Sequence, residues 1–288
     1  MEIDLNEALV QSVEVLPPLP ETVTKLKKYT DEAGSSVEVE KVAEIISIDP
    51  LLTAKLLQLA NSPYYGFKSE IKTISQVITL LGVDNVKNMV IADSIKDSFK
   101  IDVSPYGLST QDFLSACNDE ATFLTNWLGE EDKRLSHLLV PCAMLLRLGI
   151  IVFSNFLIQN KKDKEFLAKL KETNFRNINI VENEFLGVDH ISFLGFLLAN
   201  WNFDEHLIET ICFVHSPHSA SQEVIKSAYS LAIIDRIFSP YDGSSAFNVQ
   251  SAIALIEEAK HMGINFNLDH FISKLPQKAK DALNQKDN

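Results

Sequence analysis

Three cysteines are the residues of this chain whose capacity for chemistry is easiest to judge from their spacing. Cys117, Cys142 and Cys212 stand far apart, and no two of them form a CxxC pair. Zinc ribbons and disulfide frameworks both require paired or closely spaced cysteines. The sequence therefore encodes neither, and we expect each cysteine to act as a small buried apolar side chain.

Two local motifs of catalysis are also missing. The sequence contains no HExxH segment, which would place two zinc-binding histidines on one helix face, and no GxSxG nucleophile elbow. A catalytic or metal site in this chain would thus have to be assembled from residues far apart in the sequence.

A short polar and aromatic loop between two apolar segments is a candidate contact surface. Tyrosine is favoured at interfaces because it offers a large rigid face and a polar group at low entropic cost. The alternative is that Pro63 and Gly66 form a turn while the tyrosines pack inward. The candidate partner-binding residues are Asn61, Ser62, Tyr64 and Tyr65.

Nucleic acid is not an expected partner. The segment from Ile74 to Ile95 has the shape of a helix-turn-helix, but its second helix offers Lys87 against Asp84 and Asp93. The formal net charge of the chain is −13. Because duplex binding depends largely on neutralised phosphates, this charge disfavours DNA, and it disfavours anionic membranes for the same reason.

The composition predicts a folded globular protein of the cytoplasm. Of the 288 residues 46% are hydrophobic and 23% are charged, close to the average of globular domains. The first seven residues are acidic and do not resemble a signal peptide. The most apolar stretch, from Leu135 to Ile158, contains Arg147, so we expect a core helix and no membrane insertion.

Helical signals dominate the chain and predict an all-α fold. Asp49 and Pro50 provide the start of a helix, Gly82 provides an end, and Pro105 with Gly107 interrupts the pattern. We place a boundary there, between an N-terminal helical subdomain (1–104) and a second helical subdomain (105–288). The helices expected beyond it lie near 110–128, 134–158, 163–173, 189–200, 205–215, 220–239, 248–262 and 268–284.

Several motifs, in order, resemble the HDOD family of bacterial signal-output domains. They are Leu16 to Glu21, Ile46 to Leu57, Ala60 to Gly66 and, later, Glu184 to His190. The resemblance implies a multi-helix HDOD fold, in which the N-terminal subdomain packs on a degenerate relative of the HD-superfamily metal-dependent phosphohydrolases. It also implies regulation through contact with a protein partner.

The resemblance further implies that the catalytic HD doublet is lost. Aligning the segment Ala143–Gly149 with the family pattern places Leu146 and Arg147 at the His and Asp positions. The upstream histidine position falls on Ala116, or on Cys117 if the alignment slips by one residue. None of Leu146, Arg147 and Ala116 can ligate a metal, so we do not expect an enzyme.

Three residues match later ligand positions of the superfamily: His190, His215 and Asp235. With Arg147 they would form a vestigial metal site or a ligand pocket. A guanidinium about 4 Å from a divalent ion would cost about 8 kcal/mol at an effective dielectric constant of about 20. We therefore expect no cofactor, while a divalent metal on the three ligands remains the alternative.

The sequence thus predicts a non-catalytic signal-transduction module that binds a protein partner, with a nucleotide-like small ligand as a further option. The alternative is a metal-dependent phosphohydrolase or phosphodiesterase with an altered HD site. A DNA-binding regulator built on residues 74–95 is the weakest of the three hypotheses.

Overall fold

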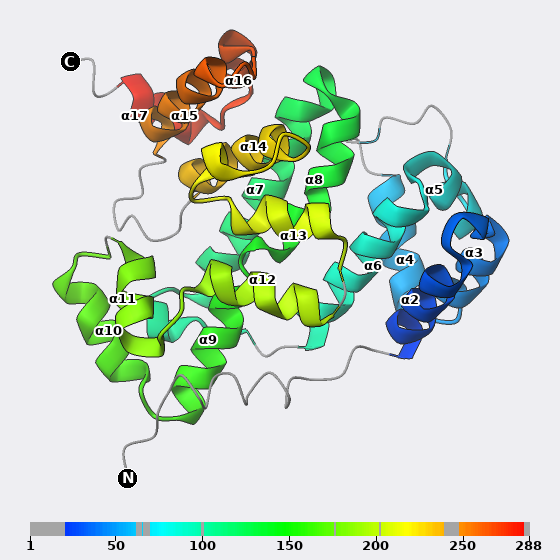
Figure 1. Ribbon diagram of the computed structural model, residues 1–288, viewed down its shortest axis with the longest axis horizontal. Helices are drawn as coiled ribbons and strands as arrows, with labels where there is room; N and C mark the ends of the chain where they lie inside the picture. Colours follow the sequence, from blue (N-terminus) through cyan, green and yellow to red (C-terminus); the bar gives the residue numbers. More distant parts are fainter. Residues whose placement is uncertain are drawn as a thin grey trace.

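The chain folds into helices throughout the part that its structure, a computed structural model, describes. The described residues are 21–61, 65, 70–98, 101–175, 177–201, 203–238 and 248–284. Every regular element among them is an α-helix or a 3-10 helix (Figure 1). The predicted all-α fold class is confirmed.

The first four described α-helices gather at one side of the molecule (Figure 1). Helix α3 buries Val42, Ala43, Ile45 and Ile46 on the face that meets α2 and α5, the i, i+3, i+4 pattern of an amphipathic helix. The side chain of Asp49 accepts a hydrogen bond from the amide of Leu52 and so caps α4 as expected. The bounds are α2 Glu21–Ala33, α3 Val39–Ser47, α4 Pro50–Ala60 and α5 Ile74–Leu81.

Helix α6 (Val83–Ser98) connects these helices to the rest of the protein. It packs against α2 and α5 on one side and against α8 (Lys133–Leu146) on the other. A second contact joins the two regions, because Lys27 donates a hydrogen bond to the carbonyl oxygen of Trp201, which follows α12 (His190–Asn200). A cation at the C-terminal end of a helix is favoured by the helix dipole.

Long helices form the centre of the remaining chain. Helix α7 packs against both α8 and α14, while α9 packs against α12 (Figure 1). The 3-10 helix η2 (Ser104–Tyr106) contacts α9 and α10. The other bounds are α7 Thr110–Glu131, α9 Leu148–Gln159, α10 Asp163–Glu172, α11 Ile178–Leu186, α13 Glu205–Cys212, α14 Ile225–Phe238, α15 Val249–His261, α16 Leu268–Lys274 and α17 Gln277–Asn284.

The single helix predicted over 134–158 is wrong in one respect. The chain breaks at Arg147 (φ −90°, ψ 1°), which separates α8 from α9. By length and composition the segment Lys133–Gln159 could cross a membrane, but 94% of its most apolar window is buried inside the protein. The core helix of a soluble protein passes the same test, so this is weak evidence for a span.

Helices α9 and α12 approach so closely that only glycine fits at their contact. A Cβ atom on Gly149 would lie 2.3 Å from the backbone carbonyl oxygen of His190. At Gly195 a Cβ atom would instead meet the side-chain Sγ of Cys212, at 2.2 Å. The Gly149 contact therefore fixes the backbone position of His190.

We predict that Gly149→Ala lowers the free energy of unfolding by about 1–3 kcal/mol or more, because a backbone carbonyl must move to make room. Urea denaturation would measure the loss. Gly195→Ala is the matched control. Its cost should fall below about 0.5 kcal/mol when measured in a Cys212→Ala background, since the obstructing sulfur is then gone. The prediction fails if Gly149→Ala is tolerated.

Candidate functional site

A buried guanidinium lies at the centre of the second helical region. Arg147 is placed there by the break between α8 and α9, and its side chain is 5% exposed. Its Nε donates to Oε1 of Glu120 on α7 at 3.0 Å, and its Nη2 contacts the same oxygen. On another edge of the guanidinium, Nη1 lies 2.9 Å from Oδ1 of Asp235 on α14. One cation thus joins three parts of the helical core.

A second buried ion pair positions His190, the first residue of α12. Its Nδ1 lies 2.8 Å from Oε2 of Glu182, and its backbone amide donates to that same oxygen at 3.0 Å. The hydroxyl of Tyr106 donates to Oε1 of Glu182 at 2.6 Å. Burial by itself lowers the pKa of His190, but the charge and hydrogen bond of Glu182 outweigh it and raise that pKa above its usual value.

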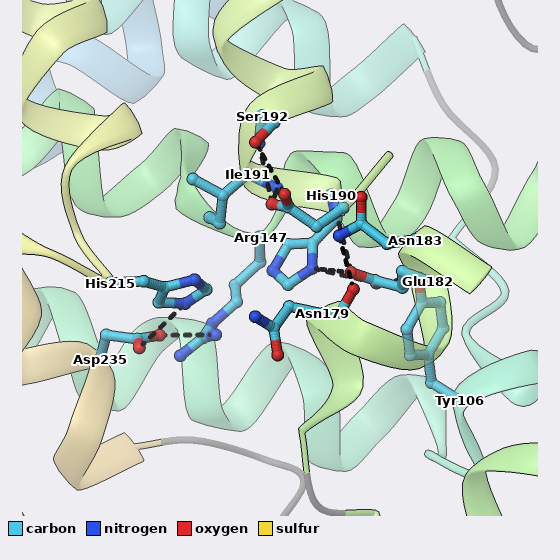
Figure 2. Close-up of polar contacts among 11 residues, drawn as sticks. Tyr106, Arg147, Asn179, Glu182, Asn183, His190, Ile191, Ser192, His215 and Asp235 are labelled. Carbon is cyan, nitrogen blue, oxygen red and sulfur yellow. Dashed lines mark hydrogen bonds and ion pairs between the residues drawn. The ribbon is translucent and has the colours of Figure 1, made fainter. Parts of the chain in front are cut away.

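His215 connects the two ion pairs. Its ring is edge-on to that of His190, with centroids 6.1 Å apart, and its Nε2 lies 3.7 Å from Oδ2 of Asp235 (Figure 2). The His215 side chain is 35% exposed, whereas those of His190 and Asp235 are buried. Burial lowers the pKa of His215. Burial raises that of Asp235, but Arg147 and His215 more than compensate and lower it overall.

The structure brings together all four residues that were proposed for the vestigial site, Arg147, His190, His215 and Asp235 (Figure 2). Ala116, the expected position of the upstream histidine, lies one turn before Glu120 on α7. It is Glu120, however, that contacts Arg147.

Sequence reasoning missed Glu120, Glu182 and Tyr106. Glu182 lies on α11, a helix absent from the predicted elements. A signal for both carboxylates was present, since each lies in the apolar stripe of an amphipathic helix. The flanking buried residues are Cys117, Phe123 and Leu124 around Glu120, and Ile178, Val181 and Leu186 around Glu182.

The residues present do not fit a metal ion while Arg147 occupies this place. Among the residues that the structure describes, no three His, Cys, Asp or Glu side chains are grouped so as to hold one. Glu120 and Asp235 both direct an oxygen at the guanidinium. A second cation beside it would meet the repulsion estimated above.

Two residues of the proposed contact loop, Asn61 and Tyr65, make contacts within the protein. Asn61 donates from Nδ2 to the carbonyl oxygens of Leu57 and Ile71, and its Oδ1 accepts from the amide of Ile71. Tyr65 is 2% exposed. Its assignment to a partner surface is therefore corrected, because its ring packs inward. Ser62 and Tyr64 lie outside the described residues.

We predict that His190 makes protein stability depend on pH. Because its folded pKa is raised, the imidazolium contributes fully below about pH 6.5, and this contribution is lost as pH rises through the folded pKa. The difference in free energy of unfolding between wild type and His190→Gln should therefore shrink from pH 6 towards pH 9. Urea denaturation at several pH values measures it.

Glu182→Gln is the matched control for this experiment. Without the carboxylate, burial is the largest remaining influence and lowers the pKa of His190. The contribution of His190 should then increase with pH. A difference that does not vary with pH in either background would contradict the assignment.

Comparisons with known proteins agree with this architecture. The family model "HDOD domain" matches residues 16–217. A crystal structure of a virulence factor from Campylobacter jejuni subsp. jejuni is 69% identical, covers 98% of each chain and superposes with a TM-score of 0.65.

A protein provisionally called a phosphohydrolase, from Shewanella amazonensis SB2B, is 25% identical, with 97% of this chain and 94% of that one covered and a TM-score of 0.65. An uncharacterized protein of Treponema pallidum (strain Nichols) is 22% identical over 84% of this chain, which spans 46% of that protein and thus about half its length. Because the HDOD model matches most of its length, the chain belongs to the HDOD domain family.

Proposed function

We propose that this protein is a non-catalytic regulatory module that acts by binding a partner protein in a signalling pathway. The observation that carries the proposal is the buried Arg147 guanidinium, which is neutralised by Glu120 and Asp235. A hydrolytic metal centre needs an accessible ion with a free coordination position for water. Here a protein side chain fills the polar centre of the HD-like half.

The charges of the site also argue against a nucleotide-like ligand. Three carboxylates, those of Glu120, Glu182 and Asp235, surround one guanidinium and His190. Even with His190 protonated, the formal charge of these five groups is −1. A phosphate group would approach against this charge and against the acidic chain as a whole, so we favour a protein partner over a phosphorylated ligand.

A second candidate function is metal-dependent phosphoester hydrolysis with altered ligands. Two observations favour it: His190, His215 and Asp235 meet in space, and a relative with 25% identity is provisionally called a phosphohydrolase. It would require a metal ion to enter beside Arg147, or Arg147 to move away. Placing a metal ion beside the Arg147 guanidinium is electrostatically costly, so hydrolysis is the weaker of the two candidate functions.

Turnover separates the two candidates. We expect the purified protein to hydrolyse p-nitrophenyl phosphate and bis(p-nitrophenyl) phosphate in the presence of MnCl2 no faster than a His190→Gln/His215→Gln variant. The release of nitrophenolate measures the rate. Wild-type turnover that the double variant loses, while circular dichroism shows it folded, would establish the hydrolase instead.

Saturable binding tests the proposed function directly. We expect affinity capture with the full chain, from cells that express it, to identify a protein that binds the purified chain with a defined stoichiometry in isothermal titration calorimetry. Variants Ile48→Ser/Leu80→Ser and Ile180→Ser/Phe196→Ser each remove two exposed apolar side chains, one pair from each helical region, and would show which region makes the contact. Failure of every captured protein to bind saturably in purified form would contradict the proposal.

A further inference from the structure

We infer that one exposed edge of helix α10, formed by Lys164 and Lys171, is a docking surface for an acidic segment of a partner protein. We call these two residues, with Lys161 in the turn before the helix, the lysine edge. The inference rests on the proposed function and deepens it, because it names the chemistry of the partner and the place of contact.

Helix α10 buries one face and exposes the other. Phe166 and Leu170 are fully buried. Lys164, Ala168 and Lys171 are exposed. Residues four and then three positions apart lie on one face of a helix, so the two lysines align over two turns. The small side chain of Ala168 lies between them, which leaves room for a partner segment to contact both.

The lysine edge lacks the ion pairs that other lysines of the protein make. None of its three side chains has a carboxylate or hydrogen-bond partner among the residues that the structure describes. On the neighbouring stripe, Nζ of Lys162 lies 2.7 Å from Oε2 of Glu165. Nζ of Lys169 lies 3.6 Å from Oε2 of Glu172. Lysines in other described helices also have carboxylate partners, as on α2, α3, α4 and α14.

A shortage of carboxylates does not explain this edge. The chain contains 39 aspartates and glutamates but only 26 lysines and arginines. Charges more than about 8 Å apart are largely screened at physiological ionic strength, so a bound segment responds mainly to nearby residues. Residues 161–172 contain five lysines, one aspartate and two glutamates. The edge is therefore locally positive on an acidic protein, and charge complementarity of this kind selects a partner and speeds its association.

The narrowness of the lysine edge favours a protein segment over a membrane or a nucleic acid. At 3.6 residues per turn, Glu165 and Glu172 come next around the helix, so a broad anionic surface would meet their negative charge. Basic segments that bind anionic lipids typically contain about four to eight lysines or arginines. Duplex binding likewise depends on many neutralised phosphates. A single helix or strand of a partner can contact one edge alone.

The test is binding of a fluorescent polyglutamate peptide, measured by fluorescence anisotropy. We expect wild type to bind this probe at about 50 mM NaCl, where screening is weak. Lys164→Gln/Lys171→Gln should bind it at least about fivefold more weakly, because two ion pairs with the probe are lost. The difference should disappear at about 1 M NaCl, where the Debye length falls to about 3 Å.

Lys260→Gln/Lys278→Gln is the matched control. It removes the same charge from two exposed lysines on α15 and α17, which lie away from α10 (Figure 1). Its affinity for the probe should change less than about twofold, since these positions are separated from the edge by more than a Debye length. Exposed substitutions of this type alter stability little, and circular dichroism would verify that both variants are folded.

Four outcomes would overturn the inference. The first is that wild type does not bind polyglutamate, and the second is an equal loss of affinity in the edge variant and the control. The third is tighter binding, dependent on the lysine edge, to phosphatidylserine vesicles or duplex DNA. The fourth is a captured partner protein that binds wild type and the edge variant equally in calorimetry, which would leave the proposed function intact. Failure of every captured protein to bind saturably would contradict the proposed function instead.

Discussion

The structure depends above all on the contact between the Arg147 guanidinium and the carboxylates of Glu120 and Asp235. Removing charged groups from water costs several kcal/mol for each ion, and only close geometry with further hydrogen bonds compensates for it. Breaking such a pair by removing one partner typically costs about 3–5 kcal/mol. The contact therefore restricts how the helices pack. Helices α7 and α14 must be placed so that Glu120 and Asp235 both reach Arg147 at the break between α8 and α9.

The same requirement extends across the core through His215. Asp235 lies near His215, whose ring faces His190, and His190 is held by Glu182 and through it by Tyr106. Elements as distant as η2, α11 and α12 thus share one polar network with α14. Buried polar groups are costly when they lack a partner, so a network of this kind disfavours alternative packings of apolar helices that would otherwise fit almost as well.

Much of the fold was predictable because helix ends are marked by local residue types, such as capping side chains and glycine. Asp189 and Asp204 accept hydrogen bonds from the first backbone amides of α12 and α13, and Gly263 follows α15 with a positive φ. The break at Arg147 was missed because the residues around it are mostly apolar, and the nearby Pro141 and Gly149 lie inside α8 and α9 instead of marking a helix end. Its cause is tertiary: the chain turns where the guanidinium meets carboxylates from other helices.

The site was predictable only in part, because it too depends on contacts between side chains of different helices. The family resemblance suggested His190, His215 and Asp235, whereas the partners that hold them depend on pairing between helices. Glu120 and Glu182 look like ordinary helix residues until the apolar face around each is considered. Tyr65 shows the opposite error, since a residue type favoured at interfaces is buried here, four residues after Asn61, whose side chain bonds to Ile71.

The identity of the cation also matters for a regulatory module. A metal ion is lost and gained with its free concentration, so a fold that depends on one changes stability with metal supply. A guanidinium remains attached to the chain, stays charged at every physiological pH and directs several hydrogen bonds in a fixed plane. On the proposed function, Arg147 thus supplies the positive charge that the buried carboxylates require while leaving no coordination position for a reactive water. On that proposal, the conformation of these helices responds to partner binding and does not depend on the supply of metal.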